Sequence, residues 1–256
     1  MSEHGKWLYE ITPHKKLIDL NLKEIWRYRD LLLLFVKRDI VTVYKQTILG
    51  PLWFFIQPLF TSVIFTLVFN NVGGITTGGI PSFLFNLAGI TAWNYFRECL
   101  TKTSNVFTGN ANIFGKVYFP RLVVPISVLI SNLIGFGIQL LLFIGFFLYY
   151  FFFSGVTISF NLLNLLWIPI LLLNMAILGL GIGLIISSLT TKYKDFKQFI
   201  GFGIQLLMFM SPVIVPMTIV TEKFPTWSIP ILEYNPMTPI IEGFRAAFFE
   251  NYAFDF

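Results

Sequence analysis

The side chains that most often carry catalysis or bind metals are few in this 256-residue chain. Cys99 is its single cysteine and cannot form a disulfide within the chain, and the only histidines, His4 and His14, have no metal-binding spacing. The nearest approach to the phosphate-binding loop G-x-x-x-x-G-K-[ST] runs from Gly109 to Val117, with one residue too many and no final hydroxyl. We therefore expect no metal, no cofactor and no catalysis in this chain.

The composition instead predicts an all-α polytopic membrane protein. Hydrophobic residues make up 55% of the chain and charged residues 12%, against about 45–50% and about 25% in soluble domains. Residues 46–96, 122–191 and 198–221 contain no Asp, Glu, Lys or Arg. The net charge is +5, but 16 of the 18 Lys and Arg residues lie outside these blocks and before residue 198. This clustering argues against nucleic acid as a partner.

Five transmembrane helices fit into the three uncharged blocks. A helix needs about 20 apolar residues to cross about 30 Å of hydrocarbon. Turn-forming residues at 70–79 and around 154 divide the first two blocks in two. The predicted spans are residues 48–69, 80–96, 122–153, 162–187 and 198–212.

The basic residues orient these spans. Nine lie before the first span, four between 97 and 121, and three between 192 and 197, whereas the loops 70–79 and 154–161 hold none. Basic residues mark the cytoplasmic side of a membrane, so the N-terminus is predicted to be cytoplasmic and residues 222–256 to lie outside. The N-terminus has no apolar core for a cleaved leader. We expect a multi-pass membrane protein with no cleaved leader.

Residues 1–45 form the predicted cytoplasmic N-terminal region, ahead of a transmembrane domain at 46–221 and a gate region at 222–256. The apolar run from Leu31 to Val36 is too short to cross a bilayer. It belongs to a helical pattern with one apolar face, which predicts a helix lying on membrane lipid at the cytoplasmic interface. A solvated helix is the alternative. The apolar face consists of Ile18, Leu22, Ile25, Leu32 and Val36.

The predicted spans contain no ionisable side chain except Tyr. A transporter driven by a proton or cation gradient binds its coupling ion inside the membrane, usually with such groups. If this chain takes part in transport, we expect another chain to supply the energy. Gly179, Gly181 and Gly183 in the fourth span allow close approach of another helix, and we expect packing rather than ligand binding there.

The connector at residues 97–121 is long for a turn between two spans and too polar to enter the bilayer. Glu98 and Lys102 have the i,i+4 spacing of an ion pair on a short helix, and Gly109-Asn110 is expected to end that helix. We interpret the connector as a cytoplasmic docking segment for a partner that delivers force. A solvated connector without a partner is the alternative.

The fifth predicted span breaks early. Pro212 comes about 14 residues into the span, or about 21 Å along a helix, and Pro216 follows one turn later. Backbone groups freed at that depth are tolerated only where protein or a water-filled cavity satisfies them. Residues 211–216 are therefore a candidate outer gate.

A short amphipathic helix is predicted after this break. Thr238-Pro239 has the pattern of an N-cap followed by proline at the first helical position. Ile241, Phe244 and Phe248 share one face of this helix, so we expect it to lie at the outer surface.

Six motifs, in this order, resemble the membrane subunits of type-2 ATP-binding-cassette exporters of lipid-linked polysaccharides. The resemblance covers essentially the whole chain. The motifs are Tyr44 to Trp53 with Gln57-Pro58, Ala88-Gly89 with Trp93 to Phe96, Phe114 to Pro120, Tyr193 to Asp195, Ser211 to Ile214, and Asn235 to Pro239.

The resemblance implies a homodimer, each copy bound to a cytoplasmic ATPase that holds ATP and Mg, exporting O-antigen or a teichoic-acid-like polymer on undecaprenyl diphosphate. Family members normally end with a sixth span and a basic tail, which are expected to be missing here because the sequence ends at Asp255-Phe256. The implied coupling residues are Glu98, Thr101, Lys102, Thr103, Ser104 and Phe107. The implied residues of the substrate entrance and channel are Gln46, Thr47, Gly50, Trp53 and Gln57. The implied outer-gate residues are Ser211, Pro212, Pro216, Asn235 and Pro236.

Two other functions stay open at this point. One is a type-2 permease for drugs or lipids, and the other is a membrane scaffold subunit that transports nothing. The first motif and the Asn-Pro-Met-Thr-Pro element favour polysaccharide export.

Overall fold

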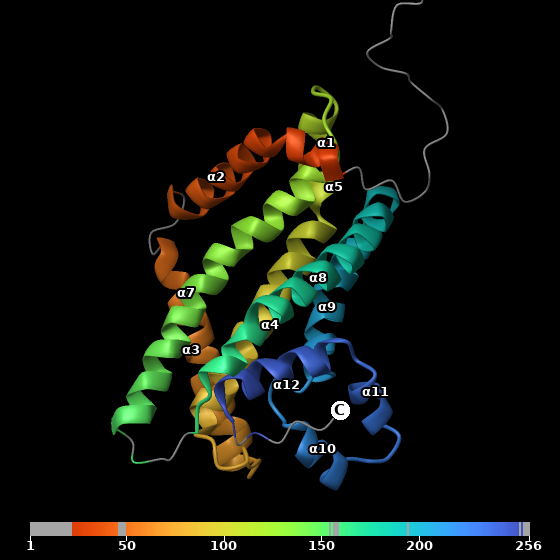
Figure 1. Ribbon diagram of the computed structural model, residues 1–256. Coiled ribbons are helices and arrows are strands. Elements are labelled where there is room, and N and C mark those ends of the chain that lie inside the picture. The colour runs from red at the N-terminus through yellow and green to blue at the C-terminus, as the bar shows by residue number, and fades with distance from the viewer. Residues whose placement is uncertain are drawn as a thin grey trace, which may run out of the picture.

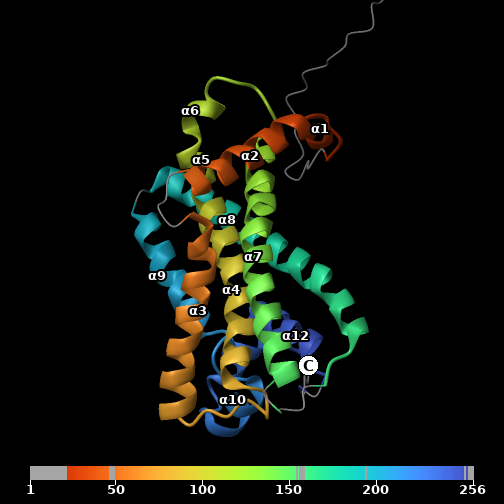
Figure 2. The same ribbon diagram turned by 90° about the vertical axis from the view of Figure 1, so that its left-hand side faces the viewer.

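The structure, a computed structural model, describes residues 22–45, 50–153, 155, 159–193, 195–250 and 252. Every regular element in these ranges is a helix, which confirms the all-α prediction. Figure 1 shows the long helices α3, α4, α7 and α8 side by side as a bundle. The short helices α1, α2, α5 and α6 lie at one end, here called the basic end, and α10, α11 and α12 lie at the other, called the gate end (Figures 1 and 2).

The elements follow one another with short connections. They are α1 (Leu22–Arg27), α2 (Arg29–Lys45), η1 (Gly50–Leu52), α3 (Trp53–Phe65), the π-helix η2 (Thr66–Val72), α4 (Ser82–Ser104), α5 (Val106–Gly109), α6 (Ala111–Phe114), α7 (Val123–Phe153), η3 (Leu162–Leu166), α8 (Trp167–Lys192), α9 (Phe196–Phe209), α10 (Met217–Lys223), α11 (Ile229–Glu233) and α12 (Met237–Phe248).

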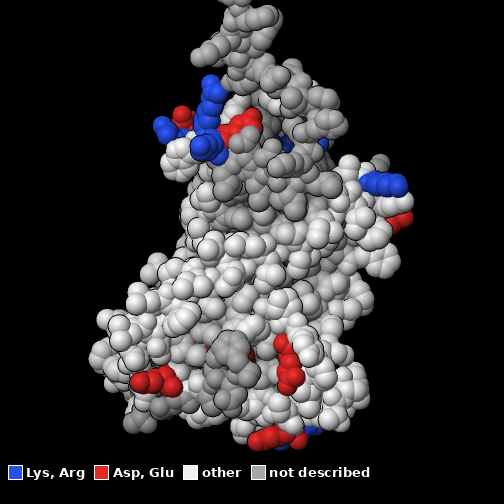
Figure 3. Space-filling model, turned by 45° about the vertical axis from the view of Figure 1, so that its right-hand side comes forward, with Lys and Arg blue, Asp and Glu red and all other residues white. Residues whose placement is uncertain are grey.

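Within the described residues, three helical segments are long and apolar enough to cross a membrane. They are Trp53–Val72, Val123–Phe153 and Leu162–Lys192, of 20, 31 and 31 residues. The predicted second and fifth spans overlap α4 and α9. Helix α4 is more polar than the three segments, and α9 is shorter, with only 14 residues. Figure 3 shows a broad uncharged belt between the charged ends of the molecule. The chain is a multi-pass membrane protein, and the number of five spans stays a prediction.

Helix α4 is the centre of the bundle. Its residues 84–96 are all buried, and α3, α7, α8 and α12 all pack against it. A Cβ atom added at Gly179 of α8 would lie 2.8 Å from Cβ of Cys99, and one added at Gly183 would lie 2.7 Å from Cβ of Thr103. The expectation of close helix packing is confirmed for Gly179 and Gly183, whereas Gly181 is exposed and a Cβ atom there would meet nothing within 4 Å.

The N-terminal amphipathic segment consists of two helices, α1 and α2, that meet at Tyr28, instead of the one helix expected. Ile25, Leu32 and Val36 are buried, as the predicted apolar face requires. They pack in a cluster with Phe119 and with residues at the start of α7, so this face rests on the chain itself. The position of the segment at the cytoplasmic interface stays a prediction. Ile18 lies outside the described residues.

We predict that glycine-to-alanine substitutions in α8 separate by position. Gly179→Ala and Gly183→Ala should lower the free energy of unfolding in detergent by about 1–3 kcal/mol, because the new methyl group overpacks the contact with α4. Gly181→Ala is the matched control, since its Cβ would meet nothing within 4 Å. It should be neutral or stabilising because alanine favours the helix. Equal thermal unfolding of all three variants would contradict the close packing.

Candidate functional site

The basic end of α4 carries the ion pair that the sequence predicts. Lys102 Nζ lies 3.5 Å from Glu98 Oε2 and donates a 2.7 Å hydrogen bond to Asn132 Oδ1 of α7. These residues do not form a separate short helix, because α4 runs without a break past Phe96 to Ser104. The helix that the predicted coupling residues occupy is therefore the helix that forms the core of the bundle.

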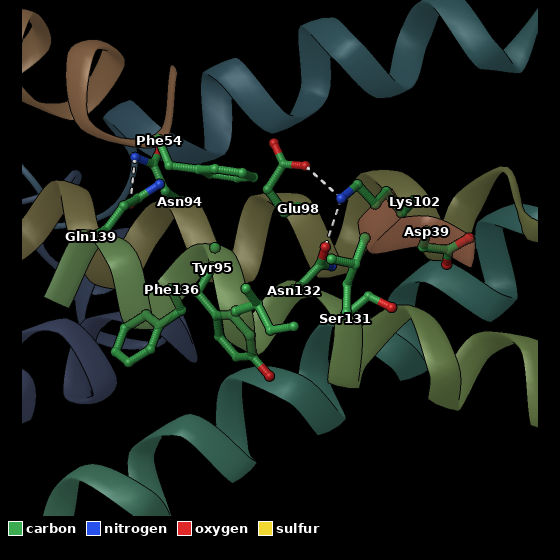
Figure 4. A pocket seen from close by; sticks show the side chains of 13 residues that line it. Asp39, Phe54, Asn94, Tyr95, Glu98, Lys102, Ser131, Asn132, Phe136 and Gln139 are labelled. Carbon is green, nitrogen blue, oxygen red and sulfur yellow. Dashed lines mark hydrogen bonds and ion pairs between the residues drawn. The ribbon is translucent and has the colours of Figure 1, made fainter. Parts of the chain in front are cut away.

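A small polar cavity lies beside this ion pair (Figure 4). Its side chains come from α2, α3, α4 and α7, and they include Asp39, Phe54 and Tyr95. Deeper in the cavity, Asn94 Nδ2 donates a 3.1 Å hydrogen bond to Gln139 Oε1. The cavity measures about 40 Å³, which holds a few water molecules but no sugar ring. It can hydrate the basic end of α4 and is too small for a polymer.

Three predicted coupling residues are tied to α8 instead of facing solvent. Thr103 and Ser104 are fully buried. The backbone carbonyl of Ser104 accepts a 3.2 Å hydrogen bond from Thr190 Oγ1, and the backbone N–H of Phe107 donates to Ser187 Oγ at 3.4 Å. Thr103 and Ser104 therefore cannot contact a partner directly, whereas Thr101 and Lys102 are exposed.

The exposed tip of the basic end lies further along the chain, and the sequence analysis did not place it among the site residues. Helix α6 and the loop after it project beyond α2 in Figure 2. After α6, Lys116, Val117 and Tyr118 are all exposed, Tyr118 to 82%. The signal was present in the sequence, since an apolar and an aromatic residue follow a lysine within a polar connector.

The predicted entrance residues divide between described and undescribed parts of the chain. Gln46 and Thr47 lie outside the described residues. Gly50 is buried and has φ +48°, a backbone conformation that favours glycine, where the chain enters η1. Trp53 and Gln57 are exposed one turn apart on α3. The structure thus brings Gly50, Trp53 and Gln57 together at the start of the first span.

The break after α9 occurs where the sequence predicts it. Helix α9 ends at Phe209, Ser211 and Pro212 lie in the turn that follows, and Pro216 is the N-cap of α10. Asn235 Nδ2 donates hydrogen bonds of 2.7 Å to the Met210 carbonyl and 2.9 Å to Ser211 Oγ. Protein groups therefore satisfy the freed backbone, as burial at this depth requires.

Asn235 also starts the next helix, which corrects the cap expected at Thr238. Helix α12 begins at Met237 after Pro236, and Asn235 Oδ1 accepts a 2.9 Å hydrogen bond from the Met237 N–H. The hydroxyl of Thr238 instead donates to the Leu232 carbonyl. Asn235 thus connects the outer break to α12 by three hydrogen bonds.

Arg245 of α12 is a central residue of the gate end that the sequence analysis missed. Its side chain is fully buried, and it donates hydrogen bonds of 2.5 Å to the carbonyls of Pro212 and Val213. It also pairs with Glu242 at 3.1 Å. Burial raises the pKa of the Glu242 carboxyl, an effect that the guanidinium of Arg245 and the hydroxyl of Tyr252 oppose.

The signal for this pair was available in the sequence. Arg245 falls beside the face formed by Ile241, Phe244 and Phe248, an unusual place for a charge on an amphipathic helix. Glu242 precedes it by three residues and is buried as well. The apolar face packs into the core of the bundle, and the position of this helix at the outer surface stays a prediction. Arg245 is explained by the two carbonyl groups that it binds, and Glu242 by the donors Arg245 and Tyr252.

A bundle of apolar helices with a buried helix break whose backbone groups are bonded by protein side chains is typical of a polytopic membrane protein. The family model for ABC-2 type transporters matches residues 30–249. The chain belongs to this family.

Curated relatives cover most of the chain. An O-antigen export system permease protein RfbA from Klebsiella pneumoniae is 31% identical over 221 residues, which make up 86% of this chain and 80% of that protein. A protein of the same name from Myxococcus xanthus is 24% identical over 230 residues, or 90% of this chain and 84% of the relative.

We predict that Asn235→Ala loosens the outer break. The substitution leaves the Met210 carbonyl and the Ser211 hydroxyl without their donor, so the free energy of unfolding should fall by about 1–3 kcal/mol. Hydrogen exchange should accelerate in peptides that cover residues 207–216. Asn71→Ala, at an exposed asparagine, is the control and should change neither quantity. Unchanged exchange in Asn235→Ala would show that this side chain does not hold the break.

Proposed function

We propose that this chain is the membrane-spanning subunit of an ATP-driven exporter of undecaprenyl-diphosphate-linked polysaccharide of the O-antigen type. It works as a homodimer in the bacterial cytoplasmic membrane, with an ATPase that binds ATP and Mg on each copy. The observation that carries this proposal is the 31% identity to an O-antigen export permease over 80% of that protein's length.

The charge distribution supports a cytoplasmic basic end. Lys23, Arg27, Arg29 and Lys37 are exposed on α1 and α2, and basic residues favour the cytoplasmic side. The exposed residues at the gate end include the acids Glu222, Glu233 and Glu250. The N-terminus and the tip around α5 and α6 then face the cytoplasm, where an ATPase can dock.

The size of the polar cavity supports a dimer. A polysaccharide cannot pass through a space of about 40 Å³, and the larger hollow of about 490 Å³ is lined only by η3, α8 and α12. A path between two copies accounts better for export of a polymer. Helices α3 and α9 present large exposed apolar side chains that a second copy can cover in part. These side chains are Trp53, Phe60, Ile64, Phe199, Phe202 and Phe209.

The exporter should depend on ATP and not on the proton gradient. The three segments that can cross a membrane contain no acidic or basic residue except Lys192 at the end of α8, and proton-coupled carriers need such groups at depth. Inverted vesicles that contain the chain and its ATPase should take up undecaprenyl-linked glycan on addition of ATP, with or without an uncoupler. Loss of uptake when the gradient collapses at constant ATP would contradict this mechanism.

Docking of the ATPase should depend on the exposed tip. We expect Tyr118→Ser to reduce copurification of the ATPase at least about tenfold, because exposed aromatic residues often dominate the energy of an interface. Tyr234→Ser is the matched control, since Tyr234 is 88% exposed but lies at the gate end. Equal recovery of the ATPase with both variants would move the docking surface away from the tip.

A further inference from the structure

Arg245 joins three separate parts of the fold through one guanidinium group. Its Nη1 and Nη2 atoms bond the carbonyls of the break after α9, and its own helix, α12, supplies Glu242. The third part is α4, because the guanidinium carbon lies 3.6 Å from the centre of the Phe85 ring. A cation this close to an aromatic face is attracted to it, more strongly where water is excluded.

Gly89 provides the space for this contact. A Cβ atom added at Gly89 would collide with Arg245 Nη2 and would lie 2.7 Å from the carbonyl oxygen of Val213. No residue larger than glycine fits there without moving the arginine or the break. The surface of α4 is therefore shaped to receive both the guanidinium and the broken backbone.

Tyr252 completes the cluster from the segment after α12. Its hydroxyl donates a 2.5 Å hydrogen bond to Glu242 Oε2, and its ring lies 5.9 Å from that of Phe85. Within the part of the chain that the structure describes, Arg245 Nε is buried without a hydrogen-bond partner. One donor of the cluster is thus unsatisfied, which is a cost in this closed arrangement.

The same helix that receives Arg245 reaches the basic end. Helix α4 spans 23 residues, or about 34 Å, and its far end holds Lys102 and the contacts to α8. A displacement of α4 at the basic end is therefore transmitted to Phe85 and Gly89 without crossing a flexible joint.

We propose that Arg245 is the positioning residue of the outer gate, fixing the break at Pro212 and Val213 to α4 so that the gate opens when this clamp is released. The inference rests on the proposed function for its transport consequence. An apolar contact of the same volume often stabilises a fold at least as well as a buried ion pair. The buried charges of Arg245 and Glu242 are therefore not needed for stability alone, which supports a contact that can be released.

Thiol labelling tests the clamp without any transport. Val213 and Cys99 are both fully buried, so Val213→Cys reports on the gate and Cys99 reports on the bundle core. In detergent, Arg245→Met should raise the rate at which N-ethylmaleimide labels the thiol introduced by Val213→Cys at least about tenfold, a change of about 1.4 kcal/mol in opening. Cys99 should stay unlabelled.

Two further variants make this result specific. Lys223→Met removes an exposed cation from α10 and should leave both labelling rates unchanged. Arg245→Lys keeps the charge but loses the planar fork that reaches two carbonyls, so its rate should fall between those of wild type and Arg245→Met. Equal labelling in Arg245→Met and Lys223→Met would overturn the proposal, and so would parallel labelling of Cys99, which indicates general loosening.

Transport with the ATPase present supplies the functional half of the test. Arg245→Met should bind the ATPase as wild type does. Its ratio of glycan exported to ATP hydrolysed should fall at least about tenfold, and a tenfold change corresponds to about 1.4 kcal/mol. Export per ATP equal to that of Lys223→Met would overturn the role of Arg245 in the gate. If wild type and Lys223→Met export no lipid-linked glycan, the proposed function fails, while the labelling result still decides the clamp.

Discussion

The gate end is organised by one constraint, the need of buried backbone carbonyls for donors where a helix stops inside an apolar environment. The carbonyls of Met210, Pro212 and Val213 receive donors from Asn235 and Arg245. Both donors come from beyond the break in the sequence, so the chain has to fold back onto the bundle to supply them. The short helices α10 and α11 lie in the stretch that makes this return, and α12 then packs against α4 and α8.

Helix α4 can occupy the centre because its neighbours tolerate close contact at both ends. At the gate end, Gly89 leaves room for the guanidinium of Arg245, and at the basic end Gly179 and Gly183 bring α8 against it. Polar side chains on α4 find partners within the bundle, as in the bond from Asn94 to Gln139. The central helix thus combines a largely apolar buried surface with close glycine contacts and paired polar groups.

Sequence patterns predicted the features that depend on local chemistry. The helix break at Pro212, the pair of Glu98 and Lys102, and the packing role of the α8 glycines follow from proline geometry, helical spacing and residue size. The full length of α4 and the burial of Thr103 and Ser104 did not follow, because tertiary contacts with α8 extend that helix into a polar stretch.

The role of Arg245 was hidden for a related reason. Its acceptors lie more than thirty residues earlier in the sequence, and no local pattern pairs a charge with distant backbone carbonyls. The start of α12 shows the same limit on a smaller scale. Its N-cap is Pro236, the side chain of Asn235 accepts a hydrogen bond from the Met237 N–H, and the hydroxyl of Thr238 donates to the Leu232 carbonyl.

The position of α4 in the chain has a consequence for biogenesis. It is synthesised before α7, which supplies the partner of Asn94, and before α12, whose Arg245 fills the notch at Gly89. Asn86 already has its partners Thr66 and Asn70 in the preceding segment, but the amide of Asn94 meets lipid unpaired until α7 emerges. Stable insertion of α4 therefore depends on later segments, so the bundle assembles cooperatively and the contact at Gly89 forms last.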